Sequence, residues 1–323
     1  DAMTGKPLPS LIGHTYGVRS IAPAGQDLLV SASSDGTVRR WDIGDLKQQQ
    51  NRVAHRFSLR DDGSELIALH GSPHTNVVDL WSLESAKAKN PALNGRNARD
   101  AVFAFDDQSL FVLSGDGMRI EQWDASQTQP MREWNLPEPA HRLVVHPAGG
   151  FIAAYSPDMP LLAVLDLSTD QVKLLDQPRS PIETAVFIKE GPRLVTGHID
   201  GTIHLWEVVS GQRVPFQGMH EGAVRFVRIT PDQVALVSGG DDGMVRLWSL
   251  NNLTMDIEFG GNVGPLTSAA FHPSGDRLLT GGADTFIRIW DPVLGDHVLA
   301  LTGHQSALTD MAFTQNGEEL ITA

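Results

Sequence analysis

The chain has 323 residues, no cysteine and a formal net charge of −14 at pH 7, because 39 Asp and Glu outnumber 25 Lys and Arg. The lack of cysteine excludes disulfides, thiolate metal sites and a cysteine nucleophile. The acidic balance argues against nucleic acid as a partner, because such a surface needs a clustered basic face. No apolar run reaches the roughly 18 residues that span a bilayer, so we expect no membrane insertion.

The predicted elements come in repeated sets of four short strands, and each set ends on a similar dipeptide. In chain order these are Trp41-Asp42, Trp81-Ser82, Trp123-Asp124, Leu165-Asp166, Trp206-Glu207, Trp248-Ser249 and Trp290-Asp291. They are 40 to 42 residues apart, a period typical of a propeller blade of four strands. We therefore expect one all-β domain over residues 1–323. Its units would span 1–42, 43–82, 83–124, 125–166, 167–207, 208–249, 250–291 and an incomplete 292–323.

The unit that ends at Trp248 shows the four strands most clearly. They are expected at Gln212–Gln217, Ala223–Ile229, Ala235–Ser238 and Met244–Trp248. The strands that correspond to the second one in other units, such as Ile182–Phe187 and Leu266–Phe271, are short apolar runs, typical of a strand covered on both faces. The last alternates apolar and polar residues, as a half-buried strand does. The turn before it, Asp242-Gly243, tolerates the positive φ that a tight hairpin needs.

The 125–166 unit departs from this pattern. Leu165 stands where the other units have Trp, and Pro157 and Pro160 fall in the turn between its last two strands. Because proline removes a backbone donor, we expect short or bulged strands there.

The two ends of the chain read as parts of one blade. Asp1–Leu11 is expected to be an outer strand, and Gly303–Ala323 a loop, an inner strand and the start of a third strand. Joining them would remove exposed sheet edges. We therefore expect a β-propeller of eight four-stranded antiparallel blades with the last incomplete. The alternative is a closed ring of seven over residues 1–291, followed by the opening of a second propeller.

Polar side chains recur at fixed offsets from the tryptophans. Ser or Thr stands ten residues before Trp (Ser31, Thr196, Ser238, Thr280), and Asp stands six before it (Asp35, Asp200, Asp242, Asp284). A His follows Gly or Met about 27 residues upstream in two units (His14, His220). With these motifs the chain resembles the WD-repeat β-propeller family over essentially its whole length. It looks like a bacterial-type member and a fragment of a longer chain.

In that family the His, Ser or Thr, Asp and Trp side chains form one hydrogen-bonded network in each blade. The resemblance implies two complete networks, His14, Ser31, Asp35, Trp41 and His220, Ser238, Asp242, Trp248. The hydrogen-bond donors and acceptors of these side chains are compatible with such networks, because indole only donates, carboxylate only accepts, and hydroxyl and imidazole do both. The units with Thr196 and Thr280 lack the His, Thr75 replaces the Asp before Trp81, and Asp116 lies seven residues before Trp123. These units are expected to rely on apolar packing.

Catalytic and metal sites are the first alternatives to consider. Ser, His and Asp could suggest a hydrolase triad, but a set that repeats blade by blade beside a Trp is better explained as structural. His55, His70, His74 and His198 are expected in loops or turns on one face, without the carboxylate pattern that supports a metal site. We expect no catalytic residue, no metal and no cofactor. The competing hypothesis is a metal- or cofactor-dependent enzyme with its site in the central channel or across the 125–166 blade.

The resemblance implies a non-catalytic scaffold or sensor that binds partner proteins. Loop residues from several blades would share one surface, in a module of a larger, cytoplasmic signalling protein. Arg225 with Phe226 is the first choice, because Arg and aromatic residues are enriched at interface centres. The full candidate set is Arg19, Glu183, Arg225, Phe226, Asp241 and Asp310.

Overall fold

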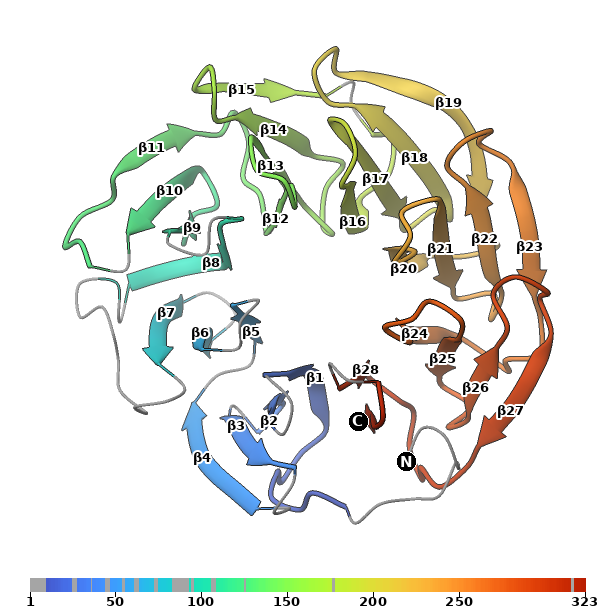
Figure 1. Ribbon diagram of the computed structural model, residues 1–323. Helices are drawn as coiled ribbons and strands as arrows, with labels where there is room; N and C mark the ends of the chain where they lie inside the picture. Colours follow the sequence, from blue (N-terminus) through green and yellow to red (C-terminus); the bar gives the residue numbers. More distant parts are fainter. Residues whose placement is uncertain are drawn as a thin grey trace. The chain divides into compact units, whose positions relative to one another are not determined.

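The computed structural model describes residues 10–24, 28–35, 37–43, 47–53, 56–60, 64–72, 75–82, 93, 96–105, 109–124, 126–175, 178–314 and 317–323. Every regular element in these ranges is a β-strand (Figure 1), so the all-β prediction is confirmed. The described residues form two compact units. The N-terminal unit lies within Pro9–Ser156 and Leu161–Gln177, and the C-terminal unit lies within Pro157–Pro160 and Pro178–Ala323.

The N-terminal unit holds fifteen of the described strands in three antiparallel sheets. The first sheet has the order β1 (Val18–Pro23), β2 (Leu28–Ser33), β3 (Thr37–Asp42), β4 (Lys47–Val53). The second has seven strands: β5 (Arg56–Leu59), β6 (Glu65–Ser72), β7 (Thr75–Ser82), β8 (Arg96–Phe103), β9 (Ser109–Ser114), β10 (Arg119–Asp124) and β11 (Arg132–Asn135). The third is β12 (Arg142–Val145), β13 (Phe151–Tyr155), β14 (Leu162–Asp166), β15 (Gln171–Leu174).

The C-terminal unit holds three four-stranded sheets and a hairpin. The first sheet is β16 (Ile182–Ile188), β17 (Arg193–His198), β18 (Thr202–Glu207), β19 (Gln212–Met219). The second is β20 (Val224–Ile229), β21 (Ala235–Gly240), β22 (Val245–Ser249), β23 (Met255–Phe259). The third is β24 (Leu266–Phe271), β25 (Leu278–Gly282), β26 (Ile287–Trp290), β27 (His297–Leu301), and the hairpin is β28 (Met311–Phe313) with β29 (Leu320–Thr322).

The number of blades differs from the expectation. The described strands form six sheets of four or more strands, not eight or seven separate four-stranded blades. The cause is the pairing of Val77 with Asn97 and of Val78 with Arg96, which joins β7 to β8, so that strands of the 43–82 and 83–124 units lie in one seven-stranded sheet. After β27 the described residues add only the β28–β29 hairpin. Most of the outer strand expected at Asp1–Leu11 lies outside the described residues.

All four strands predicted for the 208–249 unit appear, and each of their ends lies within two residues of the expected one. The first of them, β19, pairs with β18 and belongs to the preceding sheet, so the predicted unit boundary is wrong by one strand. In the 125–166 unit β13 and β14 have five residues each, and Pro157 and Pro160 lie between them. β22 and β25 have the same length, and the register of β13 with β14 is regular. The expectation of short or bulged strands in this unit is therefore wrong.

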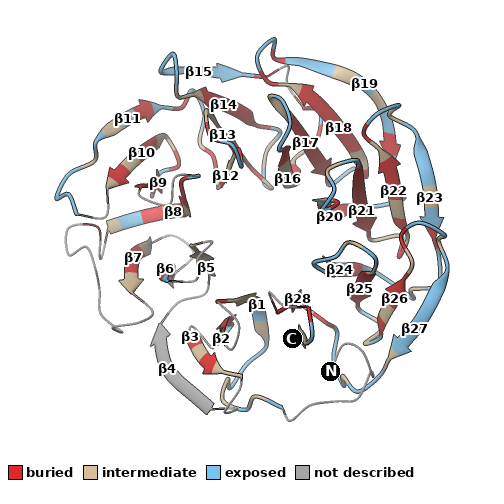
Figure 2. Cartoon of the chain, in the orientation of Figure 1, coloured by how far each residue is buried: buried red, intermediate tan, exposed pale blue. Residues whose placement is uncertain are grey.

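Burial follows the order of the strands in each sheet of the C-terminal unit. All residues of β21 and β25 are buried, whereas β19, β23 and β27 are largely exposed (Figure 2). Neighbouring sheets pack face to face. Trp248 belongs to a core cluster with Val195 and Ile203 of the preceding sheet, and Trp290 to one with Phe226 and Val237. Each of these two tryptophans therefore fastens its sheet to the one before it through a large buried apolar surface.

Candidate functional site

The first predicted network lies in the β1–β4 sheet. Trp41 Nε1 donates to Ser31 Oγ at 2.7 Å, Ser31 Oγ lies 2.7 Å from His14 Nε2, and His14 Nδ1 lies 2.9 Å from Asp35 Oδ2. Because a carboxylate only accepts, the His14 proton sits on Nδ1 and the Ser31 hydroxyl donates to Nε2. Burial opposes ionisation of Asp35, but hydrogen bonds from Thr37, Thr15 and His14 outweigh it and hold the pKa of Asp35 below its usual value.

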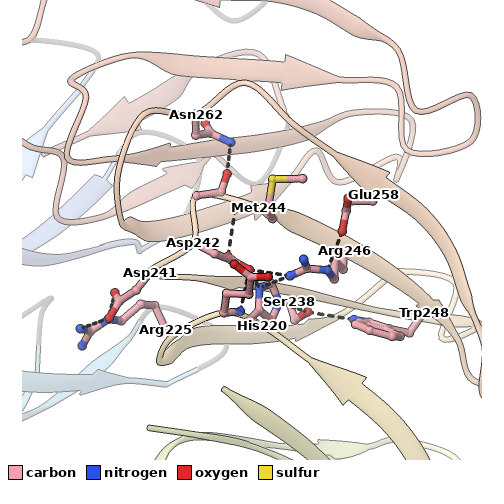
Figure 3. Close-up of polar contacts among 12 residues, drawn as sticks. His220, Arg225, Ser238, Asp241, Asp242, Met244, Arg246, Trp248, Glu258 and Asn262 are labelled. Atoms are coloured by element: carbon pink, nitrogen blue, oxygen red, sulfur yellow. Dashed lines mark hydrogen bonds and ion pairs between the residues drawn. The ribbon is translucent and has the colours of Figure 1, made fainter. Parts of the chain in front are cut away.

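The second network repeats this geometry in the β20–β23 sheet (Figure 3). Trp248 Nε1 donates to Ser238 Oγ at 2.8 Å, Ser238 lies 2.8 Å from His220 Nε2, and His220 Nδ1 lies 2.9 Å from Asp242 Oδ1. Arg246 adds a hydrogen bond to Asp242 at 2.7 Å. Burial opposes the charge of Asp242, but the bonds from Arg246 and His220 outweigh it and lower its pKa to about 2. Burial also lowers the pKa of His220, so its imidazole is neutral at pH 7.

The unit with Thr196 has a network that the sequence reading missed. Trp206 Nε1 donates to Thr196 Oγ1 at 2.9 Å, and Thr196 lies 2.8 Å from His198 Nε2. His198 Nδ1 then donates to the backbone carbonyl of Ser180 at 3.0 Å. The expectation of apolar packing alone is therefore wrong for this sheet. His198, at the end of strand β17, therefore has the role that His220, in the loop before β20, has in the second network.

The unit with Thr280 has a polar network without a histidine, so the expectation of apolar packing alone is wrong here too. Trp290 Nε1 donates to Thr280 Oγ1 at 2.8 Å. Asn262 accepts from Arg288 at 3.1 Å, and Arg288 is paired with Asp284 at 2.7 Å. This sheet therefore links its loop to its turn through an amide and an ion pair.

The serine hydroxyls of the two complete networks are not placed for nucleophilic attack. Ser238 is fully buried and Ser31 is 3% exposed, and each accepts a hydrogen bond from an indole. Among the described residues no three His, Asp or Glu side chains gather so that they could hold a metal ion. Of the four histidines considered above, His198 is engaged in its network, and His55, His74 and the side chain of His70 lie outside the described residues.

A β-bulge marks the start of the first strand in several sheets. In five strand pairs the register skips one residue, so that residue has no partner on the next strand. The skipped residues are Arg19, Arg99, Glu183, Arg225 and Thr267. Bulges re-aim side chains locally. Three of the predicted partner-binding residues, Arg19, Glu183 and Arg225, are therefore at bulge positions.

The bulge also corrects one prediction. The side chain of Arg225 is 40% exposed. The next residue, Phe226, is only 2% exposed and belongs to the core cluster with Leu266 and Trp290. The extra residue shifts the alternation of the strand, so Arg225 faces out and Phe226 faces in. Phe226 therefore cannot contact a partner, and its proposed pairing with Arg225 at an interface is wrong.

Three of the remaining candidates come together in the C-terminal unit. Arg225 donates from Nε and Nη2 to the two carboxylate oxygens of Asp241, at 2.6 and 2.8 Å. Its Nη1 lies 3.8 Å from Glu183 Oε1 on the neighbouring sheet. The hydrogen bonds that Arg225 donates to Asp241 raise the pKa of Arg225. Figure 3 shows Arg225 and Asp241 on the opposite side of the His220 network from Trp248. The bidentate pair fixes the guanidinium at the surface.

The other two candidates lie elsewhere. Arg19, in the N-terminal unit, is exposed and donates from Nε to Ser34 Oγ at 2.6 Å. Ser34 precedes Asp35 as Asp241 precedes Asp242, so this contact corresponds to the pair of Arg225 with Asp241. Asp310 accepts from Ser268 Oγ at 3.0 Å and from the backbone N–H of Met311 at 2.9 Å. Asp310 therefore joins β24 to the chain before β28, which is a structural contact.

Exposed groups surround Arg225 at the same end of the C-terminal unit's sheets. Backbone hydrogen bonds tie Ile199 to Pro181, His220 to Gly201 and Asp241 to Ala223 along this end. Acidic Asp200 and Glu221 are exposed there, as are apolar side chains: Ile199 at 42%, Val263 at 74% and Phe286 at 39%. We call this surface, centred on Glu183, Arg225 and Asp241, the bulge face.

Comparison with solved structures agrees with the sheet geometry. A crystal structure of the computationally designed Ika8 protein matches with a TM-score of 0.80 at 22% identity, covering 96% of this chain and 94% of that one. The likeness shows the fold, which is an all-β propeller with four-stranded antiparallel blades.

Sequence comparison then gives the kind of repeat. Residues 5–42, 169–207, 213–249 and 256–291 match the family described as WD domain, G-beta repeat. These four segments are therefore WD repeats, as their motifs predicted.

Two curated relatives are similar over more than half of the chain. Target of rapamycin complex subunit wat1 of Schizosaccharomyces pombe is 22% identical over 192 residues, which are 57% of this chain and 60% of that protein. Serine-threonine kinase receptor-associated protein of Dictyostelium discoideum is 23% identical over 243 residues, 60% of this chain and 80% of that protein. The chain thus spans less than two thirds of the length of wat1. Both relatives are eukaryotic, so they do not support the bacterial type expected from the sequence.

Proposed function

We propose that the chain is a non-catalytic protein-interaction module that binds a partner through the bulge face. The observation that carries the proposal is the bulge itself, which turns Glu183 and Arg225 out of their strands in neighbouring sheets and leaves Arg225 fixed by Asp241. A fixed guanidinium loses little conformational freedom on binding, and Arg is enriched where interfaces concentrate their energy.

The charge of the bulge face suggests the chemistry of the partner. The bulge face carries the carboxylates of Glu183, Asp200, Glu221 and Asp241, of which Asp241 and Glu183 lie beside the guanidinium of Arg225. A partner with Lys or Arg around an apolar centre would complement this surface. Complementary charge steers encounter more than it adds affinity, so we expect the rate of association to fall as salt rises.

The relatives support a role in assemblies. Wat1 is by its name a subunit of a target of rapamycin complex, and the Dictyostelium relative is by its name associated with a receptor. We propose that this chain likewise serves as a scaffold or sensor within a larger signalling protein or complex.

The test compares partners retained by the wild-type chain and by charge variants. Arg225→Glu should lose the specific partners from an extract of the native cells. Arg228→Glu is the matched control, because Arg228 is exposed on the same strand β20 but lies outside the bulge face. If both variants keep the same partners, or both lose them, the bulge face is not the binding surface. No helix among the described residues is long and apolar enough to cross a bilayer.

A further inference from the structure

An open groove lies away from the bulge face, between the last strands of two neighbouring sheets in the C-terminal unit. Its volume is about 670 Å³. Pro215, Phe216 and Met219 of β19 line one wall, and Met255 of β23 lines the other. Trp248 and Arg246 of β22 contribute the surface between them. Both β19 and β23 are edge strands of their sheets.

Two irregularities of strand pairing shape this groove. On β19, Ile203 pairs with Gly218 and Leu205 with Val214, so the three residues from Pro215 to Gln217 stand opposite His204 alone. The ring of Phe216 is thereby set edge-on to Trp248, with centroids 5.3 Å apart. The first irregularity therefore bends the β19 wall towards the neighbouring sheet.

The second irregularity lies on β23. Leu247 pairs with Ile257 and Trp248 with Met255, so Asp256 is the extra residue and Met255 lies on the same face as Trp248. Bulges of this kind redirect side chains and interrupt regular edge pairing. Both irregularities thus direct apolar side chains towards the groove.

The walls of the groove expose side chains suited to an apolar ligand. Met219 is 61% exposed and Met255 is 49% exposed, on opposite walls. Methionine is unbranched and polarisable, so it adapts to ligand side chains of different shape. Phe216, which is partly exposed, supplies rigid aromatic surface between the two methionines, and the edge of Trp248, which is only 5% exposed, lies behind it. The groove therefore suits one bulky aliphatic or aromatic side chain.

The charges beside the groove favour a cation. Arg246 is neutralised by two carboxylates, Asp242 at 2.7 Å and Glu258 at 2.7 Å. The side chain of Glu258 is 39% exposed, and Asp256 beside it is also exposed. The charge of Arg246 is thus outnumbered by the three carboxylates of Asp242, Asp256 and Glu258. The excess negative charge at the rim of the groove would attract a basic ligand group.

We propose that this groove docks an extended segment of a partner protein in which a bulky apolar side chain stands next to Lys or Arg. The apolar side chain enters between Met219 and Met255 onto Phe216, and the basic side chain pairs with Glu258. An extended segment fits because β19 presents a free strand edge along the groove. The proposal concerns strands outside the bulge face and does not depend on that surface binding anything.

Methyl NMR on the full chain labelled with ¹³C at the methionine methyls tests the proposal. The probe is a synthetic peptide Gly-Lys-Leu-Lys-Phe-Lys-Gly, with one control in which Glu replaces each Lys and another in which Ala replaces Leu and Phe. Spectra of Met219→Leu and Met255→Leu assign the two groove signals. Met131 is the internal reference, because it is 56% exposed and lies in the N-terminal unit.

The expected result is that the basic apolar peptide shifts the Met219 and Met255 signals and leaves Met131 in place. Both control peptides should bind at least about tenfold more weakly, because each lacks one of the two recognised groups. Met255→Ala should weaken binding by about the same factor, whereas Met131→Ala should leave it unchanged.

Three results would each overturn the proposal. One is that no groove signal shifts at millimolar peptide, or that Met131 shifts to the same degree. Another is that the Glu peptide binds as well as the Lys peptide. The third is that light scattering shows a doubled mass while the groove signals broaden with protein concentration, which would assign the groove to a second copy of this chain.

Discussion

Replacing His220 by alanine tests the network that holds the β20–β23 sheet together. His220 is 2% exposed and joins Ser238 to Asp242. Without the imidazole the Ser238 hydroxyl, which is fully buried, keeps the donor Trp248 but loses its acceptor. Leaving a buried donor unsatisfied costs about 1–3 kcal/mol. Asp242 loses less, because Arg246 and the backbone N–H groups of Glu221 and Met244 still donate to it.

The removed ring also leaves a small space in a packed interior, which adds about 1 kcal/mol. We therefore expect His220→Ala to lower the free energy of unfolding by about 2–4 kcal/mol. Urea denaturation followed by tryptophan fluorescence measures this, with His297→Ala on the exposed strand β27 as the control. The control should change stability by less than about 0.5 kcal/mol. Equal and small effects of both substitutions would refute the role given to His220.

Three further predictions concern His198, His204 and Arg225. His198→Ala should destabilise the chain by about as much as His220→Ala, because Thr196 then loses its acceptor; calorimetry showing a change below about 0.5 kcal/mol would contradict this. Burial lowers the pKa of His204 to about 4, so its stabilising effect is complete above the unfolded value near 6.5 and is lost as pH falls through about 4. His204→Phe should therefore flatten the fall in melting temperature between pH 7 and pH 4, and an unchanged slope would count against it. Arg225→Glu should change stability by less than about 1 kcal/mol, because its pair with Asp241 is partly exposed; a large loss in urea denaturation would make Arg225 a structural residue.

The fold and part of the candidate site could be read from the sequence because the network residues have few hydrogen-bonding choices. A buried Trp N–H needs an acceptor, and Ser238 and His220 at their fixed offsets were the groups available to Trp248. His198 was not predicted because the predicted networks take their histidine from the loop before the first strand of the sheet, as His14 and His220 do. Its signal was in the sequence, since residues two apart on a strand share a face and Thr196 and His198 are two apart.

Other features depended on pairing that the sequence does not reveal. Arg225 and Phe226 were expected to contact a partner together, but only Arg225 is exposed, because Phe226 packs into the core cluster with Leu266 and Trp290. The number of sheets depended on whether β7 pairs with β8, which two residue pairs decide. The groove was missed for the same reason, because bulges on β19 and β23 set its walls.

The most direct test of the account is site-specific photo-crosslinking from the bulge face. A photoreactive amino acid in place of Glu183 should cross-link the partner in native-cell extract, because Glu183 lies at a bulge, 3.8 Å from Arg225 at the centre of that face. The same amino acid in place of Arg228, exposed on strand β20 outside the face, should give no such product. A partner captured from position 228 and not from position 183 would contradict the account.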